Sequence, residues 1–363
     1  MILFRMDIQV SNTLPEKHYT MINIIMYTRL LFGLYSKLHK CLAFAVITKS
    51  YCVTYAIVTT YFCKQMYLFL KQKDINMPLI VTLAPFIVTI LVSLLTDGEY
   101  FFDYLEGIDK IHNLAFVKEE HFKVLFSFIV FIFVILFRVL RITIFLFLPN
   151  EFFNSLIAVY FLMLLSVNLS HITEILMFEI LFIRLRSLRR TMDSFSSVSH
   201  SDNEEQEAML TTTLTDYLIA YKNILDNNKT IGHATKLLIR MLCYYYSLRI
   251  KTVAEHARVM PKSVIIMLEF LINIFLSLLP ALFGELASAE AEKIKDNLTK
   301  QHRICNIDAL RKKILDAMKF LEIRPIKFTV WRMFTVDLSL PLSIISVFIT
   351  YTIVLLQFNQ VKT

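Results

Sequence analysis

A stripe of polar side chains runs along the last apolar segment of the chain, residues 338–358. Its members recur every three or four residues and therefore share one face of a helix, and five of the six are polar; they are Ser339, Ser343, Ser346, Thr350, Ile353 and Gln357. Hydroxyl and amide groups in this arrangement can replace part of the water around a permeating ion. One helix encloses no pathway, so this chemistry needs several copies around a common axis. The alternatives are that the hydroxyls assist helix packing or bond to their own backbone.

The two ends of this stripe differ in character. Toward the C-terminus, Ile353 from each copy would form an apolar ring between rings of polar side chains. Gln357 with Phe358 would form a constriction that acts as a gate. The stripe contains no acidic residue, so its side chains predict no strong selection for cations. Asp337, directly before the helix, either adds a ring of negative charge or caps the helix N-terminus.

Ionisable side chains inside apolar segments are the second candidate for chemistry, because lipid penalises them strongly. Arg138 and Arg141 are three residues apart and share a helix face. Counted from Lys123 at about 1.5 Å per residue, Arg138 lies roughly 22 Å into a hydrocarbon core about 30 Å thick. Glu269 lies at a similar depth in a later segment, and Asn273 lies one turn deeper.

We therefore predict an ion pair between Glu269 and Arg138 or Arg141 that borders a ligand pocket together with Asn273. Tyr160, with its neighbour Phe161, is a candidate aromatic wall of this pocket or an ordinary core residue. A purely structural ion pair remains open, as does an Arg141 side chain that extends to the membrane surface.

Further polar residues lie in the segment 152–182, namely Asn168, Ser170, His171, Thr173 and Glu174. We interpret them as an inward-facing polar side of one helix. His171 and Glu174 supply only two ligands, so no metal site is predicted. The chain also lacks a glycine-rich phosphate loop, zinc-ligand spacing and a Ser/His/Asp arrangement, so neither an enzyme nor a cofactor is expected.

The elements that carry these residues are predicted from composition and hydropathy. Hydrophobic residues make up 56% of the 363 residues and aromatic residues 13%, and the mean hydropathy is +0.58. Such a chain is typical of an all-α integral membrane protein, because each crossing needs about 20 apolar residues. The apolar segments are 42–66, 78–96, 123–148, 152–182, 263–285 and 338–358, with the more charged 233–257 as a further candidate.

Basic residues decide the orientation and the number of crossings. The segments 184–236 and 286–336 are both rich in basic residues, for example Arg184, Arg186 and the run Arg311-Lys312-Lys313, which places both in the cytoplasm. Two loops on one side require an even number of crossings between them, so 233–257 must cross as well. The result is seven transmembrane helices with a cytoplasmic N-terminus and an extracellular C-terminus, opposite to a G-protein-coupled receptor.

The chain is therefore predicted to be a single seven-helix domain, 1–363. It divides into a cytosolic N-terminal segment (1–41), helices 1–6 with the ligand pocket (42–285), a cytosolic anchor segment (286–337) and the pore helix (338–358). Helix 4 is expected to continue past the bilayer through Arg186, followed by a flexible linker, 193–206. Residues 306–322 are expected to form an amphipathic helix that packs on other helices or lies on the membrane surface.

The end of the last helix resembles a known family. Thr350-Tyr351, five further residues and then Gln357-Phe358 look like the signature of insect gustatory receptors, and the preceding segment 328–337 is similar to theirs. The resemblance implies a tastant-gated, non-selective cation channel in the plasma membrane of a gustatory neuron. It implies a homotetramer, or a heteromer with other gustatory receptors, with helix 7 lining the central pore and Gln357 and Phe358 at the gate. It implies no need for a G protein and no nucleic-acid partner.

One position bears on the ligand. Sugar-receptor members of that family carry Glu after the Thr-Tyr pair, whereas this chain has Thr352, which favours a bitter or other plant compound over a sugar. The alternatives are an odorant-receptor-type channel subunit that works with a co-receptor, and a secondary transporter. The Gln357-Phe358 ending favours the gustatory reading over the odorant one. The sequence shows no inverted repeat of the kind that transporters contain.

Overall fold

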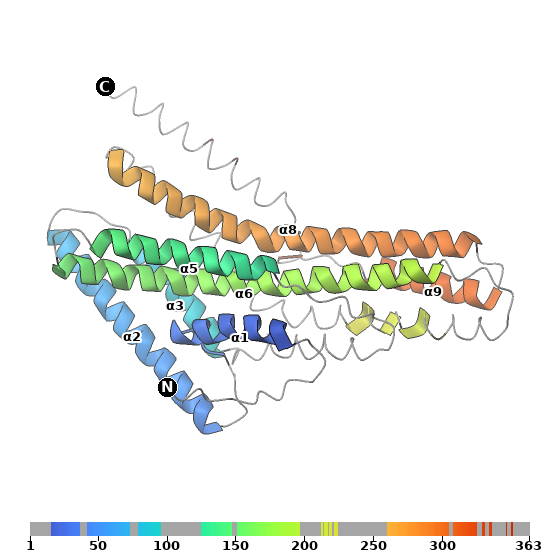
Figure 1. The fold of residues 1–363 in the computed structure, drawn as a ribbon, viewed down its shortest axis with the longest axis horizontal. Coiled ribbons are helices and arrows are strands. Elements are labelled where there is room, and N and C mark those ends of the chain that lie inside the picture. Colours follow the sequence, from blue (N-terminus) through green and yellow to red (C-terminus); the bar gives the residue numbers. More distant parts are fainter. Residues whose placement is uncertain are drawn as a thin grey trace.

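The computed structural model describes residues 16–36, 42–72, 79–95, 125–146, 151–196, 212, 214–216, 218–219, 221–223, 260–304, 308–324, 329–330, 334–335, 346 and 350. These residues form the helices α1 (Glu16–Leu31), α2 (Leu42–Gln72), α3 (Leu79–Leu95), α5 (Leu125–Leu146), α6 (Glu151–Ser196), α8 (Met260–Ile304) and α9 (Asp308–Ile323). The short strands β1 (Thr329–Val330) and β2 (Phe334–Thr335) pair antiparallel. Figure 1 shows α5, α6 and α8 running alongside one another, with α2 inclined to them.

The predicted apolar spans are found as helices wherever they are described. The limits of α3 and α5 agree with the predicted 78–96 and 123–148 within two residues, and α2 extends six residues beyond the predicted 66. Three segments in the described residues are long and apolar enough to cross a membrane: Leu42–Gln65, Leu125–Thr143 and Val159–Arg190. The chain is therefore a multi-pass membrane protein. The predicted span 233–257, and all of 338–358 except 346 and 350, lie outside the described residues.

Helix α6 is the centre of the bundle. It contacts α1, α2, α3, α5 and α8. Within its span, 94% of the most apolar stretch is buried, against 17% for α2 and 28% for α5. Other helices cover nearly all of this stretch of α6, including its polar side chains, whereas α2 and α5 leave most of their apolar surface for lipid.

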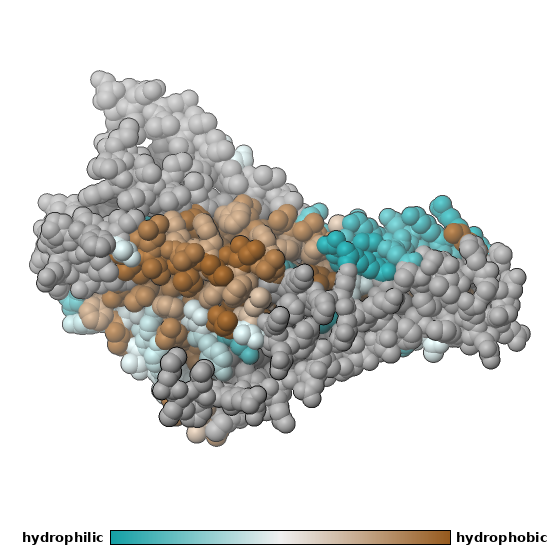
Figure 2. All heavy atoms as spheres, in the orientation of Figure 1, coloured by the Kyte–Doolittle hydropathy of each residue, from teal (hydrophilic) through white to brown (hydrophobic). Residues whose placement is uncertain are grey.

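The two longest helices extend well beyond a bilayer. Helices α6 and α8 contain 46 and 45 residues. At about 1.5 Å per residue each is nearly 70 Å long, more than twice a hydrocarbon core of about 30 Å. Hydrophobic side chains gather over the half of the molecule that holds α5, and hydrophilic ones gather where α8 and α9 end (Figure 2). The helix predicted to continue through Arg186 does so, and it reaches Ser196, inside the predicted linker.

Helix α8 passes through residue 285, the expected boundary between helices 1–6 and the anchor segment. The helix runs unbroken to Ile304 because the stretch after Gly284 is rich in Ala, Glu and Lys, which favour helix, and contains no proline. Figure 1 shows α8 bending along its length. Pro280 lies inside this helix, where its missing N–H leaves one backbone hydrogen bond unmade and accounts for the bend.

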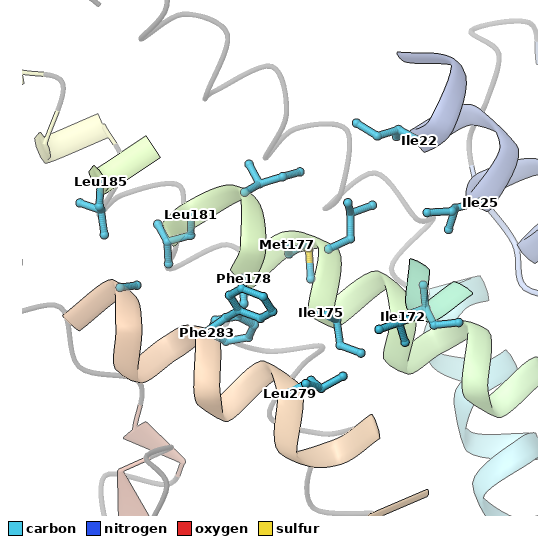
Figure 3. Packing of buried hydrophobic residues seen from close by; sticks show 14 of the residues in the cluster. Ile22, Ile25, Ile172, Ile175, Met177, Phe178, Leu181, Leu185, Leu279 and Phe283 are labelled. Atoms are coloured by element: carbon cyan, nitrogen blue, oxygen red, sulfur yellow. The ribbon is translucent and has the colours of Figure 1, made fainter. Parts of the chain in front are cut away.

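The hydrophobic core lies where α1 and α8 pack on α6 (Figure 3). Phe283 of α8 is buried beside two aromatic rings, Phe126 of α5 at 5.3 Å between ring centroids and Phe182 of α6 at 6.2 Å. The contact with Phe126 is edge to face, the geometry that aromatic quadrupoles favour. This aromatic group fixes how three helices meet near the middle of the bundle.

Helix α1, inside the predicted cytosolic segment 1–41, was not predicted from the sequence. It ends in a Schellman turn: Leu34 N donates to Arg29 O at 3.0 Å and Gly33 N donates to Leu30 O at 3.0 Å. Gly33 has φ +79°, and a Cβ there would lie 2.3 Å from a Tyr55 ring carbon. Only glycine suits this position, on both conformational and steric grounds.

Hydroxyl groups of three other helices hold the end of α1. Tyr51 Oη of α2 donates to Leu31 O at 2.6 Å, and Ser166 Oγ of α6 donates to Phe32 O at 2.8 Å. Ser93 Oγ of α3 accepts from Tyr35 N at 3.2 Å. Non-helical backbone at membrane depth is stable only when its polar groups are paired in this way. The end of α1 therefore reaches the level of the apolar span of α6.

Helix α9 confirms the predicted amphipathic helix, and it packs on α8. Its buried side chains recur at helical spacing; they are Leu310, Ile314, Ala317 and Leu321. Leu315 is 38% exposed because it lies one position off that face. The contact with α8 supports packing on helices rather than on a membrane surface.

Candidate ligand site and pore

Helix α5 is positioned by a carboxylate from α6. Glu179, 4% exposed, accepts hydrogen bonds from Phe126 N at 3.1 Å and Ser127 N at 2.9 Å, and also from Ser127 Oγ. The first N–H groups of a helix have no partner within it and carry partial positive charge, so a carboxylate satisfies both needs. The sequence reasoning missed Glu179, although an acidic residue within an apolar segment was the available signal.

Arg138 lies on α5, eleven residues beyond Ser127, and is fully buried. It contacts Asn168 of α6, whose side-chain amide is oriented with its oxygen toward Arg138 and its nitrogen toward Asn273. In that orientation Asn168 Oδ1 accepts from Arg138 Nε at 3.2 Å and from an Arg138 terminal nitrogen at 2.7 Å, and Asn168 Nδ2 donates to Asn273 Oδ1 of α8 at 3.1 Å. The Arg138–Asn168–Asn273 cluster thus joins three helices inside the bundle.

Two of the residues predicted for the ligand pocket, Arg138 and Asn273, are therefore brought together, and Asn168 links them. The side chain of Glu269 lies outside what the structure describes, so its pair with Arg138 or Arg141 stays a prediction. Arg141 points to a different environment: its guanidinium lies 4.6 Å from the centroid of the Phe161 ring. A cation over an aromatic face is stabilised by the ring quadrupole.

Tyr160 and Phe161 lie next to this second arginine. Their ring centroids are 5.7 Å apart in an edge-to-face contact, and Phe161 is 2% exposed, whereas Tyr160 is half-buried. The region thus holds a buried cation, Arg138, bonded to an amide and, three residues further along α5, a second arginine over an aromatic ring. Such a combination suits a small organic molecule that carries an aromatic ring and a polar group.

A hollow opens beside the Arg138–Asn168–Asn273 cluster, between α1, α5 and α6. Its volume is about 360 Å³. Its lining is apolar except at Arg138 and Thr28, and the other lining residues are Phe32, Phe131, Ile132, Ile135, Leu136, Val139, Ile142, Leu162 and Leu165. The volume falls within the range of small-molecule sites, about 300–1,000 Å³.

His171 and Glu174 form a second buried polar pair on α6. They are 1% and 4% exposed, and His171 Nδ1 lies 3.7 Å from Glu174 Oε2, too far for a hydrogen bond. His171 Nδ1 and Glu174 Oε1 have no hydrogen-bond partner among the residues that the structure describes. Among the described residues, no three His, Cys, Asp or Glu side chains are grouped closely enough to hold a metal ion.

A charged cluster joins α6 and α8 at the opposite, hydrophilic end of the molecule. Glu290 accepts from Arg189 Nε at 2.5 Å and from Lys293 Nζ at 2.9 Å, and Arg189 also contacts Asp193 at 2.5 Å. Asn297 donates to Asp193. Burial alone would raise the pKa of Glu290, but the hydrogen bonds and charges of Lys293 and Arg189 outweigh it and lower that pKa. The Arg189–Glu290 cluster therefore ties the two long helices together.

Two members of the predicted pore stripe are described, Ser346 and Thr350. Both are helical and exposed, and Thr350 Oγ1 donates to Ser346 O at 2.9 Å. This bond is the backbone bonding given above as an alternative, and it leaves the hydroxyl oxygen free to accept from water. The other predicted pore, gate and motif residues lie outside the described part of the chain: Ser339, Ser343, Tyr351, Ile353, Gln357 and Phe358. Their roles stay predictions.

No family model matches the sequence, and no curated protein is similar to it at a significant level. Solved structures do match. The insect olfactory receptor OR5 from Machilis hrabei aligns with a TM-score of 0.62 and 14% identity, over 94% of this chain and 99% of the receptor. The chain has the fold of an insect olfactory receptor. A structure of the same receptor in complex with eugenol aligns with a TM-score of 0.58 and 15% identity, over 94% and 98%.

The olfactory-receptor fold covers nearly the whole chain, so it includes the helices that carry both polar clusters. It agrees with the prediction of a mainly helical protein with several apolar helices. The gustatory assignment is not decided by it, since the two structures named here are of one olfactory receptor.

Proposed function

We propose that this chain is a subunit of a small-molecule-gated, non-selective cation channel of the insect chemoreceptor type. The observation that carries the proposal is the fold shared with an insect olfactory receptor over nearly the full length of both chains. Seven helices cross the plasma membrane with the N-terminus in the cytoplasm and the C-terminus outside. Four subunits surround a pore lined by the helix at 338–358, with Gln357 and Phe358 at its gate.

The fold favours an odorant-receptor-type subunit that works with a co-receptor, because both similar structures are olfactory receptors. A gustatory subunit is the second candidate. It is supported by the C-terminal residues Thr350, Tyr351, Gln357 and Phe358, which resemble the gustatory signature. The two candidates share the same pore and differ in their partner subunits and in the ligands that open them.

The ligand of this subunit is a plant-derived aromatic or alkaloid molecule rather than a sugar. The Arg141 guanidinium lies over the Phe161 ring, which also contacts Tyr160, and this arrangement suits a ring with a hydroxyl, ether or carbonyl group. Binding uses hydrogen bonds and packing only, so the function requires neither a cofactor nor a G protein.

Expression of the full chain in cultured cells with a calcium reporter tests the proposal. The chain is expressed alone and with an odorant co-receptor, then exposed to eugenol, related phenylpropanoids, alkaloids and sugars. Responses that need the co-receptor support the odorant type, and responses of the chain alone support the gustatory type. Surface-expressed protein that responds to no compound in either setting, or external labelling of an N-terminal tag, would refute the proposal.

Two matched pairs of variants locate the pore and the pocket. Gln357→Ala is expected to change ion permeability, whereas Gln360→Ala, beyond the helix, leaves it unchanged. Tyr160→Ala is expected to raise the ligand concentration for half response, whereas Tyr61→Ala, 58% exposed on α2, does not. Equal effects within either pair would remove Gln357 from the pore or Tyr160 from the pocket.

A further inference from the structure

Helix α5 carries a continuous row of exposed apolar side chains along its membrane-spanning segment. The row includes Ile132 (41% exposed), Leu136 (63%) and Val139 (54%). These three side chains also form one wall of the hollow between α1, α5 and α6. The hollow is therefore open along the side of α5 that the bundle leaves uncovered, and Figure 2 shows apolar surface over this region.

The opposite wall of this hollow is held rigidly. It is formed by Thr28 and Phe32 at the end of α1. The carbonyl of Phe32 accepts from Ser166 of α6, and Gly33 packs against the Tyr55 ring of α2. Because α1 forms one fixed wall and α5 the other, the groove keeps its shape when it is empty. Binding of an occupant therefore requires little rearrangement of the protein.

The dimensions of the groove match half of a bilayer. Its lining on α5 runs from Phe131 to Ile142. At about 1.5 Å per residue that is roughly 16 Å, close to half of a hydrocarbon core about 30 Å thick. One leaflet contributes that half, and each of its acyl chains extends over this distance. Under the proposed topology the groove lies in the outer leaflet.

We propose that this groove binds one acyl chain of a bilayer phospholipid. The lining offers almost no polar surface, so the part of the ligand inside must be hydrocarbon and the headgroup must lie beyond the end of the groove. Apolar cavities of this kind stay dry and accept apolar guests. Lipid is the most concentrated apolar molecule in the membrane, so even weak affinity fills the site.

The bound chain has a consequence for the candidate ligand site. Arg138 lines the groove with one side of its side chain and bonds to Asn168 with its guanidinium. An acyl chain in the groove keeps water away from that arginine on the membrane side. Lower local polarity strengthens hydrogen bonds between charged and polar groups. The lipid is thus a structural part of the Arg138–Asn168–Asn273 cluster.

Photolabelling tests this proposal without any measurement of current. The full-length protein is reconstituted in phosphatidylcholine nanodiscs that contain a fraction of phosphatidylcholine with a diazirine on one acyl chain, then irradiated and digested. We expect labelled residues concentrated in 131–142 and 162–165, above the level on the exposed face of α2 around Ile57 (64% exposed). Labelling spread evenly over α2 and α5 would overturn the proposal.

A matched pair of variants on one helix sharpens the test. Leu136→Trp fills the groove, whereas Leu140→Trp changes a side chain that is 58% exposed but outside the lining. If the tryptophan weakens binding of the acyl chain by at least about 1 kcal/mol, labelling of 162–165 falls about fivefold or more in Leu136→Trp. Labelling of the same residues is expected to stay unchanged in Leu140→Trp. Equal loss in both variants, or preferential labelling by a diazirine-bearing sterol, would refute an acyl-chain site.

The elution volume of each variant in size-exclusion chromatography shows whether it is folded. If Leu136→Trp does not fold, Val139→Trp replaces it as the groove-filling variant.

Failure of this proposal is distinct from failure of the proposed function. A protein that conducts no current but labels in the groove retains the lipid site. A ligand-gated channel with even labelling retains the function and loses the site.

Discussion

Replacement of Asn168 by leucine removes the amide that links α5, α6 and α8. Arg138 loses a partner for two of its N–H groups, at 3.2 and 2.7 Å, and Asn273 loses a donor at 3.1 Å. Neutral hydrogen bonds between membrane helices contribute only about 0.6 kcal/mol on average. Here the donor is a fully buried cation, and hydrogen bonds to charged groups contribute about 1.5–3 kcal/mol.

We therefore expect Asn168→Leu to lower the free energy of unfolding by about 1.5–3 kcal/mol, which corresponds to roughly 3–12 °C in melting temperature. The assay is size-exclusion chromatography of a fluorescently tagged protein after heating. Asn168→Asp is the matched control: it has nearly the same shape and keeps an oxygen acceptor for Arg138, so its melting temperature should stay near that of the parent.

The double variant Arg138→Met, Asn168→Leu decides whether the two side chains act on each other. Replacement of both partners by apolar groups also removes the N–H groups that Asn168→Leu leaves without this acceptor, so the double variant should be more stable than Asn168→Leu alone. Two results would contradict this reasoning. One is Asn168→Leu with the melting temperature of the parent, and the other is a double variant whose loss equals the sum of the single losses.

Three further predictions concern other parts of the bundle. Glu179→Ala removes the cap of α5 and should cost about 1–3 kcal/mol in a melting assay, while Glu179→Gln, which keeps one acceptor oxygen, should cost less. Gly33→Ala should lower the melting temperature because the new methyl group meets the Tyr55 ring, and Tyr55→Ala should relieve that contact but not the cost of positive φ. The lowered pKa of Glu290 adds stability above the pKa of the unfolded carboxyl, about 4.3, which is lost as pH falls through the folded pKa; melting of Glu290→Gln should therefore depend less on pH below 5 than melting of the parent.

Hydropathy located the apolar helices well but did not reveal which polar side chains contact one another between helices. The predicted 123–148 and observed Leu125–Leu146 nearly coincide, because a long apolar run has no other stable state in lipid. Depth along such a helix follows from residue count, and it placed Glu269 at the level of Arg138 and Asn273 one turn deeper. Rotation about the helix axis depends on packing, so the sequence did not indicate the contact between Arg138 and the amide of Asn168.

Helix α1 shows a different limit of sequence reasoning. Its first residues, Glu16, Lys17 and His18, are polar, and the apolar stretch that follows is too short to cross a bilayer. Its stability comes from contacts made only in the folded protein, namely the Gly33 turn and the hydroxyl of Ser166 on α6. Short helices depend on tertiary packing in this way, so no local sequence pattern predicts them.

The two polar clusters tie the same two helices at different heights, and this has a mechanical consequence. On α6, Asn168 and Arg189 are about 32 Å apart, and the helix between them contains neither glycine nor proline. On α8 the corresponding residues, Asn273 and Glu290, are separated by Pro280. A ligand that displaces Asn273 from Asn168 can therefore move the outer part of α8 about the proline while the Arg189–Glu290 cluster stays intact. Under the proposed function, α6 stays fixed in each subunit and ligand binding moves the part of α8 before Pro280, which carries Asn273, since the helix bends most easily at the proline.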